Sequence, residues 1–315
     1  MMMSMTRGKT KKKSRLPSYV FMIINTIVWG AALIVVKPAF EATTPFRFLL
    51  YRYIIAAILA TPLLFHFLPK IKNLKKTLAK ITLLEILGGT IALSLLYSGL
   101  NLTSAIEASL ITTTTPIFVS IFAVATLKEK EEKHEVVGMA IAFAGTLLLT
   151  LFPLLNGYAT IKDISLTGNL LIVGQNIATA LYFILAKKHY QKLPKIFIAT
   201  ISFYVCLITF ASLSAFETGG ITQLLSAIHQ DLQHLSVWVT GGYMAVFGSI
   251  IGLTAYLKGQ EGIEASEATL FTYLQPLIYL PLGFWLLSEK IYPLQIGSLL
   301  IILLGVVIAQ RRSWR

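Results

Sequence analysis

The chain has 315 residues, of which 56% are hydrophobic and 13% are charged, and its formal net charge is +13. Soluble globular proteins carry about 25% charged residues, so this composition excludes an ordinary soluble domain and indicates an integral membrane protein. The single cysteine, Cys206, excludes an intrachain disulfide and any cysteine-based metal motif. We therefore expect no metal site and no cofactor.

Long apolar runs recur along the chain. The hydrocarbon core of a bilayer is about 30 Å thick, so a spanning helix needs about 20 apolar residues. We predict ten spanning helices near residues 18-40, 46-68, 81-100, 104-127, 135-153, 166-186, 196-216, 236-257, 264-287 and 292-310. These runs do not alternate between apolar and polar residues, as the strands of a membrane β-barrel would. The predicted fold class is an all-α integral membrane protein.

Lys and Arg are unevenly distributed when these helices are threaded alternately through a bilayer. With the N-terminus inside, all but five of the 27 Lys and Arg residues fall on the cytoplasmic side. The five exceptions are Lys37, Arg47, Arg52, Lys162 and Lys290. Because cytoplasmic loops carry an excess of basic residues, both termini are predicted to be cytoplasmic in a multi-pass protein of the cell membrane. The basic loops would face anionic lipid, so we expect a lipid bilayer and no nucleic acid as partner.

Two segments of the chain resemble each other at an offset of 160 residues. Without a gap, residues 105–130 match residues 265–290 at Ala105, Glu107, Ala108, Leu110, Thr112, Pro116, Leu127, Glu129 and Lys130. Further upstream, an offset of 150 matches Lys37 to Lys187. Glu, Pro and the Glu-Lys pair in one register indicate an internal duplication rather than a chance match of apolar helices.

The duplication predicts two five-helix repeats, 18-153 and 166-310, joined by a linker at 154-165. Basic tails, 1-17 and 311-315, flank them. Because each repeat has an odd number of helices, the second must enter the membrane from the opposite side. Inverted repeats of this kind are typical of secondary transporters.

Three sequence features together resemble the EamA-type branch of the drug/metabolite transporter superfamily. They are the run WGAALIVVKPAF from Trp29, the run PFRFLLYRYIIAA from Pro45, and the duplicated block that contains A-x-E-A, Pro and Glu-Lys. The resemblance covers essentially the whole chain. It implies a ten-helix carrier with a central cavity, related to exporters of amino acids and other metabolites. It does not imply a particular substrate.

Pro116 and Pro276 lie at matching positions in the middle of the predicted fourth and ninth helices. A proline inside a helix removes an amide donor and clashes with the preceding turn, so we expect a kink at each. The carbonyls freed near Thr112 and Thr272 would need partners, which neighbouring hydroxyl and amide side chains or a wet cavity could supply. We expect these two helices to carry gates, with a static packing kink as the alternative.

Polar and aromatic side chains inside the predicted helices are candidates for a substrate cavity. Amides exposed to lipid would be expensive, so such groups are expected to face inward. Hydrogen bonds between helices explain them equally well without a ligand. The cavity candidates are Asn25, Trp29, Tyr97, Thr112, Gln175, Asn176, Tyr182, Tyr256, Thr272 and Gln275.

Four charged residues near these helices have a structural and a functional interpretation. Arg52 could extend to the interface, pair with an acid, or bind an anionic substrate, and we favour the first two because it lies toward an outer helix end. Glu107 and Glu267 lie in first helical turns, where an acid stabilises the helix end. Alternatively, they or Glu85 bind a coupling proton, and Glu85 is near enough to the inner face to meet Lys80.

The segment 216-236 is predicted to contain an interfacial helix on the outer side, with His229, Asp231 and His234 on a wet polar face. The chain has no G-x-S-x-G, Walker A or G-x-G-x-x-G motif, so no enzyme is predicted. The prediction is a secondary transporter that moves a small organic solute, such as an amino acid or related metabolite, by alternating access. A membrane sensor, or a membrane enzyme without a recognisable motif, is the alternative. Oligomeric state stays open between monomer and homodimer.

Overall fold

The computed structural model describes residues 15–71, 73–103, 105–127, 132–155, 166–191, 193–287 and 293–309. Within these ranges the chain is helical and has no strand. Six segments are long and apolar enough to cross a membrane: Leu16–Glu41, Pro45–Phe67, Leu74–Leu102, Thr167–His189, Lys195–Thr218 and Leu235–Gly259. The apolar helices Thr115–Leu127 and Ile296–Ala309 are shorter. The all-helical membrane class is therefore confirmed, whereas the number of ten spans stays a prediction.

The described elements follow one another without any sheet. The first part of the chain forms α1 (Leu16–Val36), η1 (Lys37–Glu41), α2 (Pro45–Phe67), η2 (Leu68–Lys70), α3 (Leu74–Glu85), η3 (Ile86–Ile91), α4 (Ala92–Leu102), α5 (Ala105–Thr112), α6 (Thr115–Phe122), η4 (Ala123–Leu127) and α7 (Lys133–Leu155). The second part forms α8 (Leu166–His189), α9 (Lys195–Thr218), α10 (Ile221–Asp231), α11 (Leu235–Tyr243), η6 (Met244–Leu253), α12 (Thr254–Gly259), α13 (Ala265–Leu270), η7 (Phe271–Leu274), α14 (Pro276–Leu287) and α15 (Pro293–Ala309).

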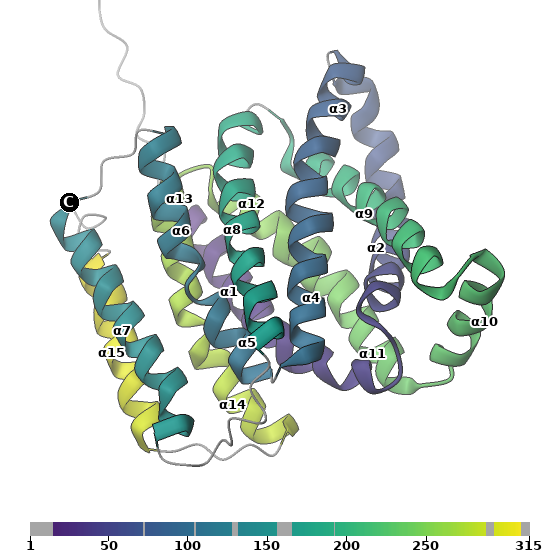
Figure 1. Ribbon diagram of the computed structural model, residues 1–315. Helices are drawn as coiled ribbons and strands as arrows, with labels where there is room; N and C mark the ends of the chain where they lie inside the picture. Colours follow the sequence, from purple (N-terminus) through teal and green to yellow (C-terminus); the bar gives the residue numbers. More distant parts are fainter. Residues whose placement is uncertain are drawn as a thin grey trace, which may run out of the picture.

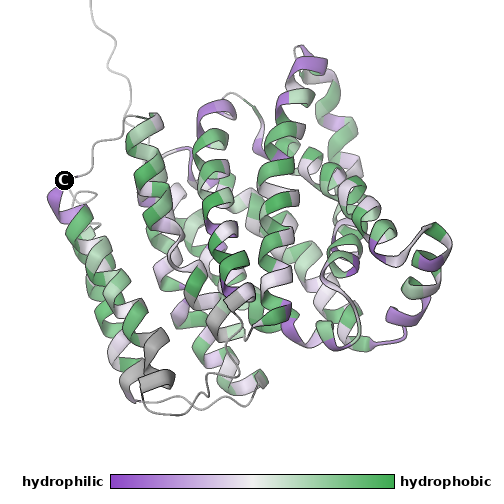
Figure 2. Ribbon diagram, viewed as in Figure 1, coloured by the Kyte–Doolittle hydropathy of each residue, from purple (hydrophilic) through white to green (hydrophobic). Residues whose placement is uncertain are grey.

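The helices form a bundle in which α7 and α15 lie along one edge and α10 lies at the other (Figure 1). Apolar residues cover the helices along their length, and hydrophilic residues concentrate near helix ends, for example at the top of α3 (Figure 2). Large apolar side chains point outward, such as Leu83 and Trp285, which are 71% and 78% exposed. An exposed apolar belt of this extent is what a lipid-facing surface requires.

Helices from the two parts of the chain pack against each other throughout the bundle. The main pairs are α2 with α9, α4 with α8, α1 with α12, and α7 with α15. At the crossing of α7 and α15, a Cβ on Gly138 would lie 2.4 Å from the Ala309 nitrogen, and one on Gly305 would lie 2.5 Å from the Ala142 nitrogen. These glycines therefore allow two helices of the same chain to approach at backbone distance.

At Pro116 the structure breaks the helix rather than kinking it. Helix α5 ends at Thr112, and Pro116 lies in the first turn of α6, where a missing N–H leaves no bond unmade. The Thr115 Oγ1 lies 2.7 Å from the Thr112 carbonyl oxygen that the proline frees. The Asn176 Nδ2 of α8 donates to the Ile111 carbonyl at 2.7 Å. Asn176 therefore acts as a clamp on this break.

At Pro276 the chain is likewise discontinuous. Helix α13 ends at Leu270, the 3-10 segment η7 follows, and α14 begins at Pro276. The backbone N–H of Gln275 donates to the Thr272 carbonyl oxygen at 3.0 Å, and this bond satisfies the carbonyl that the proline frees. The Thr26 Oγ1 of α1 donates to the Phe271 carbonyl at 3.2 Å. The disruption expected at each proline is a break between two helices: a turn at Thr113 and Thr114 separates α5 from α6, and the 3-10 segment η7 separates α13 from α14.

The segment before α11 contains a buried ion pair. Helix α10 exposes Ile221 and Leu225, as an interfacial helix would, and buries Leu224. Asp231 is only 4% exposed and accepts from Arg47 Nε at 2.7 Å and from Tyr51 Oη at 2.7 Å. The prediction that Asp231 lies on a wet polar face was therefore wrong, because its carboxylate fastens α10 to the start of α2.

Candidate functional site

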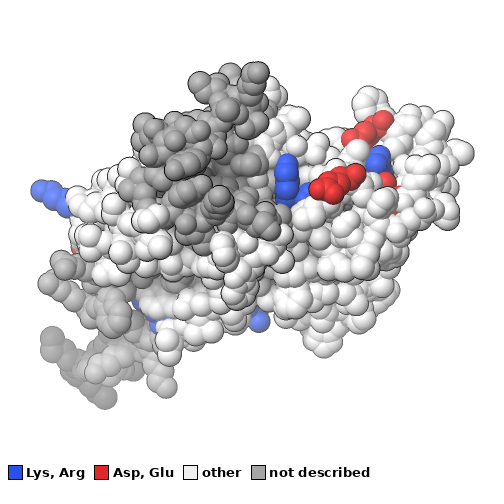
Figure 3. All heavy atoms as spheres, turned by 90° about the horizontal axis from the view of Figure 1, so that it is seen from below, with Lys and Arg blue, Asp and Glu red and all other residues white. Residues whose placement is uncertain are grey.

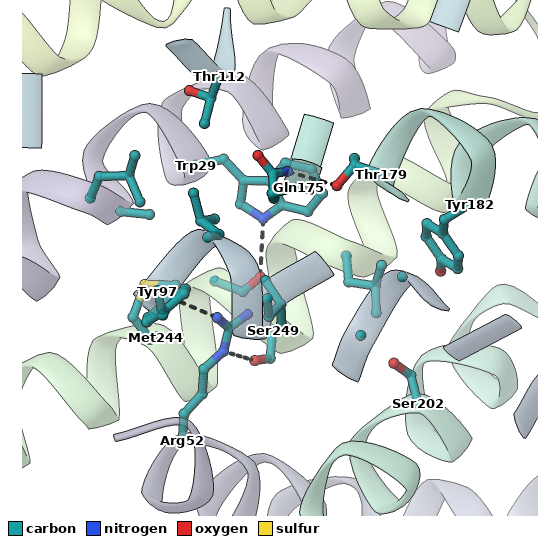
Figure 4. Close-up of a pocket in the computed structure, with 18 of the residues that line it drawn as sticks. Trp29, Arg52, Tyr97, Thr112, Gln175, Thr179, Tyr182, Ser202, Met244 and Ser249 are labelled. Atoms are coloured by element: carbon teal, nitrogen blue, oxygen red, sulfur yellow. Dashed lines mark hydrogen bonds between the residues drawn. The ribbon is translucent and has the colours of Figure 1, made fainter. Parts of the chain in front are cut away.

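The centre of the bundle contains a cavity of about 170 Å³. Both parts of the chain contribute to its wall: α1, α2, α3, η3, α4, α5 and α6 from the first, and α8, α9, η6 and η7 from the second. Figure 4 shows labelled wall side chains from several of these elements converging on it. An apolar cavity of about 150 Å³ can bind benzene, so this cavity has room for a small organic molecule.

Seven of the ten predicted cavity residues line this wall. They are Trp29, Tyr97, Thr112, Gln175, Tyr182, Thr272 and Gln275. The wall also contains apolar side chains, among them Leu93, Leu96, Phe183, Phe203 and Leu253. A largely apolar cavity with a few convergent polar groups is the usual form of a small-molecule site.

The other three predicted cavity residues support the wall from behind. The Asn25 Nδ2 donates to the Gly252 carbonyl at 3.0 Å. Asn176 clamps the break between α5 and α6. Tyr256 stacks on Phe183 with a ring-centroid distance of 4.0 Å and accepts from Gln260. For these three, interhelical bonding and packing explain the side chain.

Trp29 forms an aromatic shelf of the cavity with Phe183 and Tyr256. Its ring stacks on Tyr256 at 5.5 Å and on Phe183 at 6.5 Å between centroids. Its Nε1 donates to the Gly248 carbonyl at 3.1 Å (Figure 4). A Cβ on Gly252 would lie 2.5 Å from Nε1, so the glycine is what lets the indole approach η6.

Arg52 extends into the cavity wall and not to the membrane interface. It is 6% exposed, and its Nε donates to Ser249 Oγ at 2.7 Å while Nη1 donates to Tyr97 Oη at 3.0 Å (Figure 4). The guanidinium carbon lies 5.1 Å from the Tyr53 ring centroid. No carboxylate of the described residues forms a salt bridge with it. Both favoured interpretations, interfacial extension and pairing with an acid, were therefore wrong.

Glu85 also lines the cavity, on the side formed by α8 and α9. It is 1% exposed, and its carboxylate accepts from Tyr182 at 2.9 Å, Tyr190 at 3.0 Å and Ser202 at 2.6 Å. The expected contact with Lys80 near the inner face is absent from the described ion pairs. Within the described ranges, the hydrogen-bond partners of this carboxylate are all hydroxyl groups.

The remaining candidates lie away from the cavity. Glu267 accepts from Tyr19 Oη at 2.6 Å and lies 3.6 Å from Arg15 Nη1, so it links α13 to the start of α1. This position agrees with a role at a helix end. The side chain of Glu107 lies outside the described residues. Pro116 and Pro276 lie at the two helix breaks and do not themselves line the wall.

Sequence reasoning missed several hydroxyl groups of the wall, notably Ser202, Ser249, Thr115 and Thr179. Serine and threonine are common in membrane helices because their hydroxyls bond to the preceding turn, so their presence alone carries little signal. Ser202 aligns with Arg52 at the offset of 150 residues that relates Lys37 to Lys187. That alignment was the one available signal that position 202 faces the cavity.

Comparison with known proteins identifies the family. The model of the EamA-like transporter family matches residues 16–151 and again residues 166–310. This chain belongs to the EamA-like transporter family. The family resemblance inferred from the sequence is thus confirmed. As an EamA-like transporter, the protein is a multi-pass transporter of the cell membrane, in a family whose relatives are named as transporters and not as enzymes.

Relatives of this EamA-like transporter occur in bacteria and archaea. The uncharacterized transporter YyaM of Bacillus subtilis is 26% identical over 293 residues, which cover 92% of each chain. The uncharacterized inner membrane transporter YedA of Escherichia coli is 26% identical over 301 residues, which cover 93% of this chain and 90% of YedA. A chain described only as "Crystal structure of protein" has the same fold, with a TM-score of 0.70 at 16% identity over 96% of this chain and 99% of that one.

Proposed function

We propose that the protein is a secondary transporter that moves a small organic solute, an amino acid or related metabolite, across the cytoplasmic membrane by alternating access. The central cavity is the observation that carries this proposal. It lies between helices of both parts of the chain, it has room for a small organic molecule, and it contains buried charged residues that lipid would not tolerate. The sequence has no Walker A motif, which favours a facilitator or an ion-coupled carrier over a pump.

Pairs of equivalent contacts support an inverted repeat. Lys37 Nζ donates to the Thr103 carbonyl at 2.7 Å, and Lys187 Nζ donates to the Ile263 carbonyl at 2.8 Å. The two lysines are related by the offset of 150 residues and the two carbonyls by the offset of 160. The same offsets relate the clamp of Asn176 on Ile111 to that of Thr26 on Phe271.

The proposed transport cycle uses the two helix breaks as gates. In each repeat a broken helix is bonded by a side chain of the other repeat, and the π-helical segments η3 and η6 both contribute to the cavity wall. Broken helices around a central site are the parts that move when inverted repeats rock against each other. The repeats would comprise residues 18-153 and 166-310.

The proposed topology has ten spans and both termini inside. Among the described residues seen from below in Figure 3, few are charged, and most of these, basic as well as acidic, lie toward the side of α10. Few basic residues are expected on the outer side, because basic residues are retained on the cytoplasmic side. In a Cys206→Ser background, a membrane-impermeant maleimide added to intact cells should label Thr222→Cys in α10 and not Gln191→Cys after α8. The reverse pattern would invert the topology.

Counterflow in proteoliposomes tests the function directly. Vesicles preloaded with pooled amino acids and metabolites should exchange at least one labelled solute through the native protein. The variant Gln275→Leu, which alters the wall, should reduce this exchange, whereas the same substitution at exposed Gln223 in α10 should not. Folded native protein that exchanges nothing from the pool would argue against a carrier.

A further inference from the structure

We propose that the cavity binds zwitterionic solutes, with the carboxylate of the solute on Arg52 and its ammonium group on Glu85. This inference rests on the proposed function, since it specifies the solute of the same cavity. The observation behind it is that one cavity wall carries an arginine and a glutamate that are both buried and that, within the described part of the chain, bond only to neutral groups.

Arg52 retains unused capacity for an anion. Within the described chain, its Nε and Nη1 donate to Ser249 and Tyr97, whereas Nη2 has no hydrogen-bond partner. A Cβ on Gly248 would lie 2.5 Å from Met244 Cε and 3.7 Å from Nη2, so the glycine lets the Met244 side chain lie in the wall near Arg52. A guanidinium has five N–H donors in a planar fork that fits a carboxylate. The hydroxyls orient the fork and leave one of its ends for a ligand.

Glu85 likewise retains capacity for a cation. Its Oε1 accepts from both tyrosines, whereas Oε2 accepts from Ser202 alone among the described residues. A carboxylate offers about four acceptor positions, so one remains for an ammonium N–H. A Cβ on Gly88 would lie 2.2 Å from the Tyr182 ring, so this glycine lets Tyr182 approach η3 and reach the carboxylate.

The two charged groups are held apart by separate sets of hydroxyls. Figure 4 shows Arg52 with Tyr97 and Ser249 on one side of the pocket, and Ser202 and Tyr182 on the other. An isolated charge buried away from water is costly unless it is paired. Either charge could be offset by an ion of opposite sign, but such an ion would leave the other group unpaired. A ligand with both charges compensates the two groups at once and keeps the occupied cavity neutral.

The rest of the wall predicts the body of the solute. Trp29, Phe183, Leu93, Leu96 and Phe203 present aromatic and aliphatic surface to the same cavity. Apolar surface of this kind favours an uncharged, apolar side chain on the zwitterion. A further charge on the solute would have no described counter-charge on the wall.

Ligand binding to the purified protein tests the inference without requiring transport. The probes are L-amino acids with uncharged side chains, from alanine to norleucine, each with the amine that lacks its carboxylate and the acid that lacks its ammonium group. For norleucine these analogues are pentylamine and hexanoate. At least one zwitterion should raise the thermal unfolding temperature, and its amine and its acid should bind at least tenfold more weakly. An amine or acid that binds as tightly as its zwitterion would overturn the inference.

Charge variants assign the two ends of the solute. Arg52→Gln should weaken zwitterion binding by about tenfold to a hundredfold, the range typical of a lost charged hydrogen bond. It should also reduce the ratio by which the protein prefers the zwitterion to its amine. Glu85→Gln should weaken it similarly and narrow the preference over the acid, a change of selectivity that a purely structural role would not cause. Arg52→Lys and Glu85→Asp keep the charges in case either neutral variant fails to fold. Arg15→Gln and Glu217→Gln are matched controls away from the cavity and should change neither preference. Unchanged selectivity in folded Arg52→Gln and Glu85→Gln would overturn the assignment.

Binding and counterflow together separate the two proposals. Exchange of a solute from the pool that is not zwitterionic, with no binding from the amino acid series, would overturn the zwitterion assignment and leave the transporter proposal standing. Binding of a zwitterion with the predicted selectivity, but without exchange, would support the zwitterion assignment and overturn the transporter proposal.

Discussion

Two arginines of α2, five residues apart, show how differently the same charge is treated in two regions of the molecule. Arg47 meets Asp231 at 2.7 Å, with Tyr51 bonded to the same carboxylate. Arg52 bonds to the neutral hydroxyls of Ser249 and Tyr97 and lines a cavity. The charge of Arg47 is neutralised by a carboxylate of the protein. The charge of Arg52 is held in position but has no described counter-charge, which is what a site for an anionic group requires.

The largest effect is expected from breaking the complete pair. Asp231→Asn removes the carboxylate that Arg47, Tyr51 and Thr43 share and leaves a largely buried guanidinium without a counter-charge. Breaking a buried pair from one side costs about 3 to 5 kcal/mol. We expect a loss of this size in the free energy of unfolding, measured by denaturation in detergent. An unchanged stability would mean that the pair is not structural.

The matching substitution at Arg52, which has no described counter-charge, should lower transport and not stability. Arg52→Gln removes a buried charge that no described carboxylate compensates, so the unfolding temperature should stay the same or rise. Solute exchange should fall by about tenfold to a hundredfold in counterflow. If Arg52→Gln destabilised the protein as strongly as Asp231→Asn, the two arginines would have the same structural role and the comparison would fail.

A neutral clamp offers an intermediate case. Asn176→Leu leaves the Ile111 carbonyl and the hydroxyls of Thr114 and Thr115 without their amide partner. Unsatisfied buried polar groups cost about 1 to 3 kcal/mol, so we expect a loss near 2 kcal/mol in unfolding free energy. Hydrogen exchange should also increase in α5 and α6. Uniform exchange across the bundle would show that the break is not held by this residue.

The smallest effect is expected at the equivalent clamp of the other repeat. Thr26→Val removes one hydroxyl bond of 3.2 Å to the Phe271 carbonyl and keeps the side-chain shape. We expect a loss of about 1 kcal/mol in unfolding free energy, with faster hydrogen exchange confined to α13, η7 and α14. If the exchange increased at α5 and α6 instead, the proposed equivalence of the two clamps would be wrong.

The family and the membrane class could be predicted because they depend on local and additive properties. The run from Ile296 to Ala309 is helical because a spanning segment must satisfy its own backbone bonds, whatever its neighbours are. The register of Glu107 with Glu267 and of Pro116 with Pro276 is a property of the sequence alone. The position of each proline also located the two discontinuities, although each is a break between helices where a kink was expected.

The partner of each side chain could not be predicted in the same way. Asn25, Asn176 and Gln175 are all amides in predicted helices, yet only Gln175 lines the cavity. Sequence spacing gives the position of a residue along its helix, but the rotation of the helix about its axis depends on packing against its neighbours. Small residues such as Gly88 and Gly252 decide these rotations through close approaches that a single sequence does not reveal.

The sequence by itself therefore determined that the chain is a helical membrane protein with two related halves. The length of apolar runs, the position of basic loops and the internal register all depend on the order of residues and not on tertiary contacts. Only the tertiary structure decided that Arg47 is paired and Arg52 is not, that Glu85 lies among three hydroxyls, and that Asp231 is buried. Each of these facts depends on residues more than 90 positions apart in the chain, brought together by packing between helices.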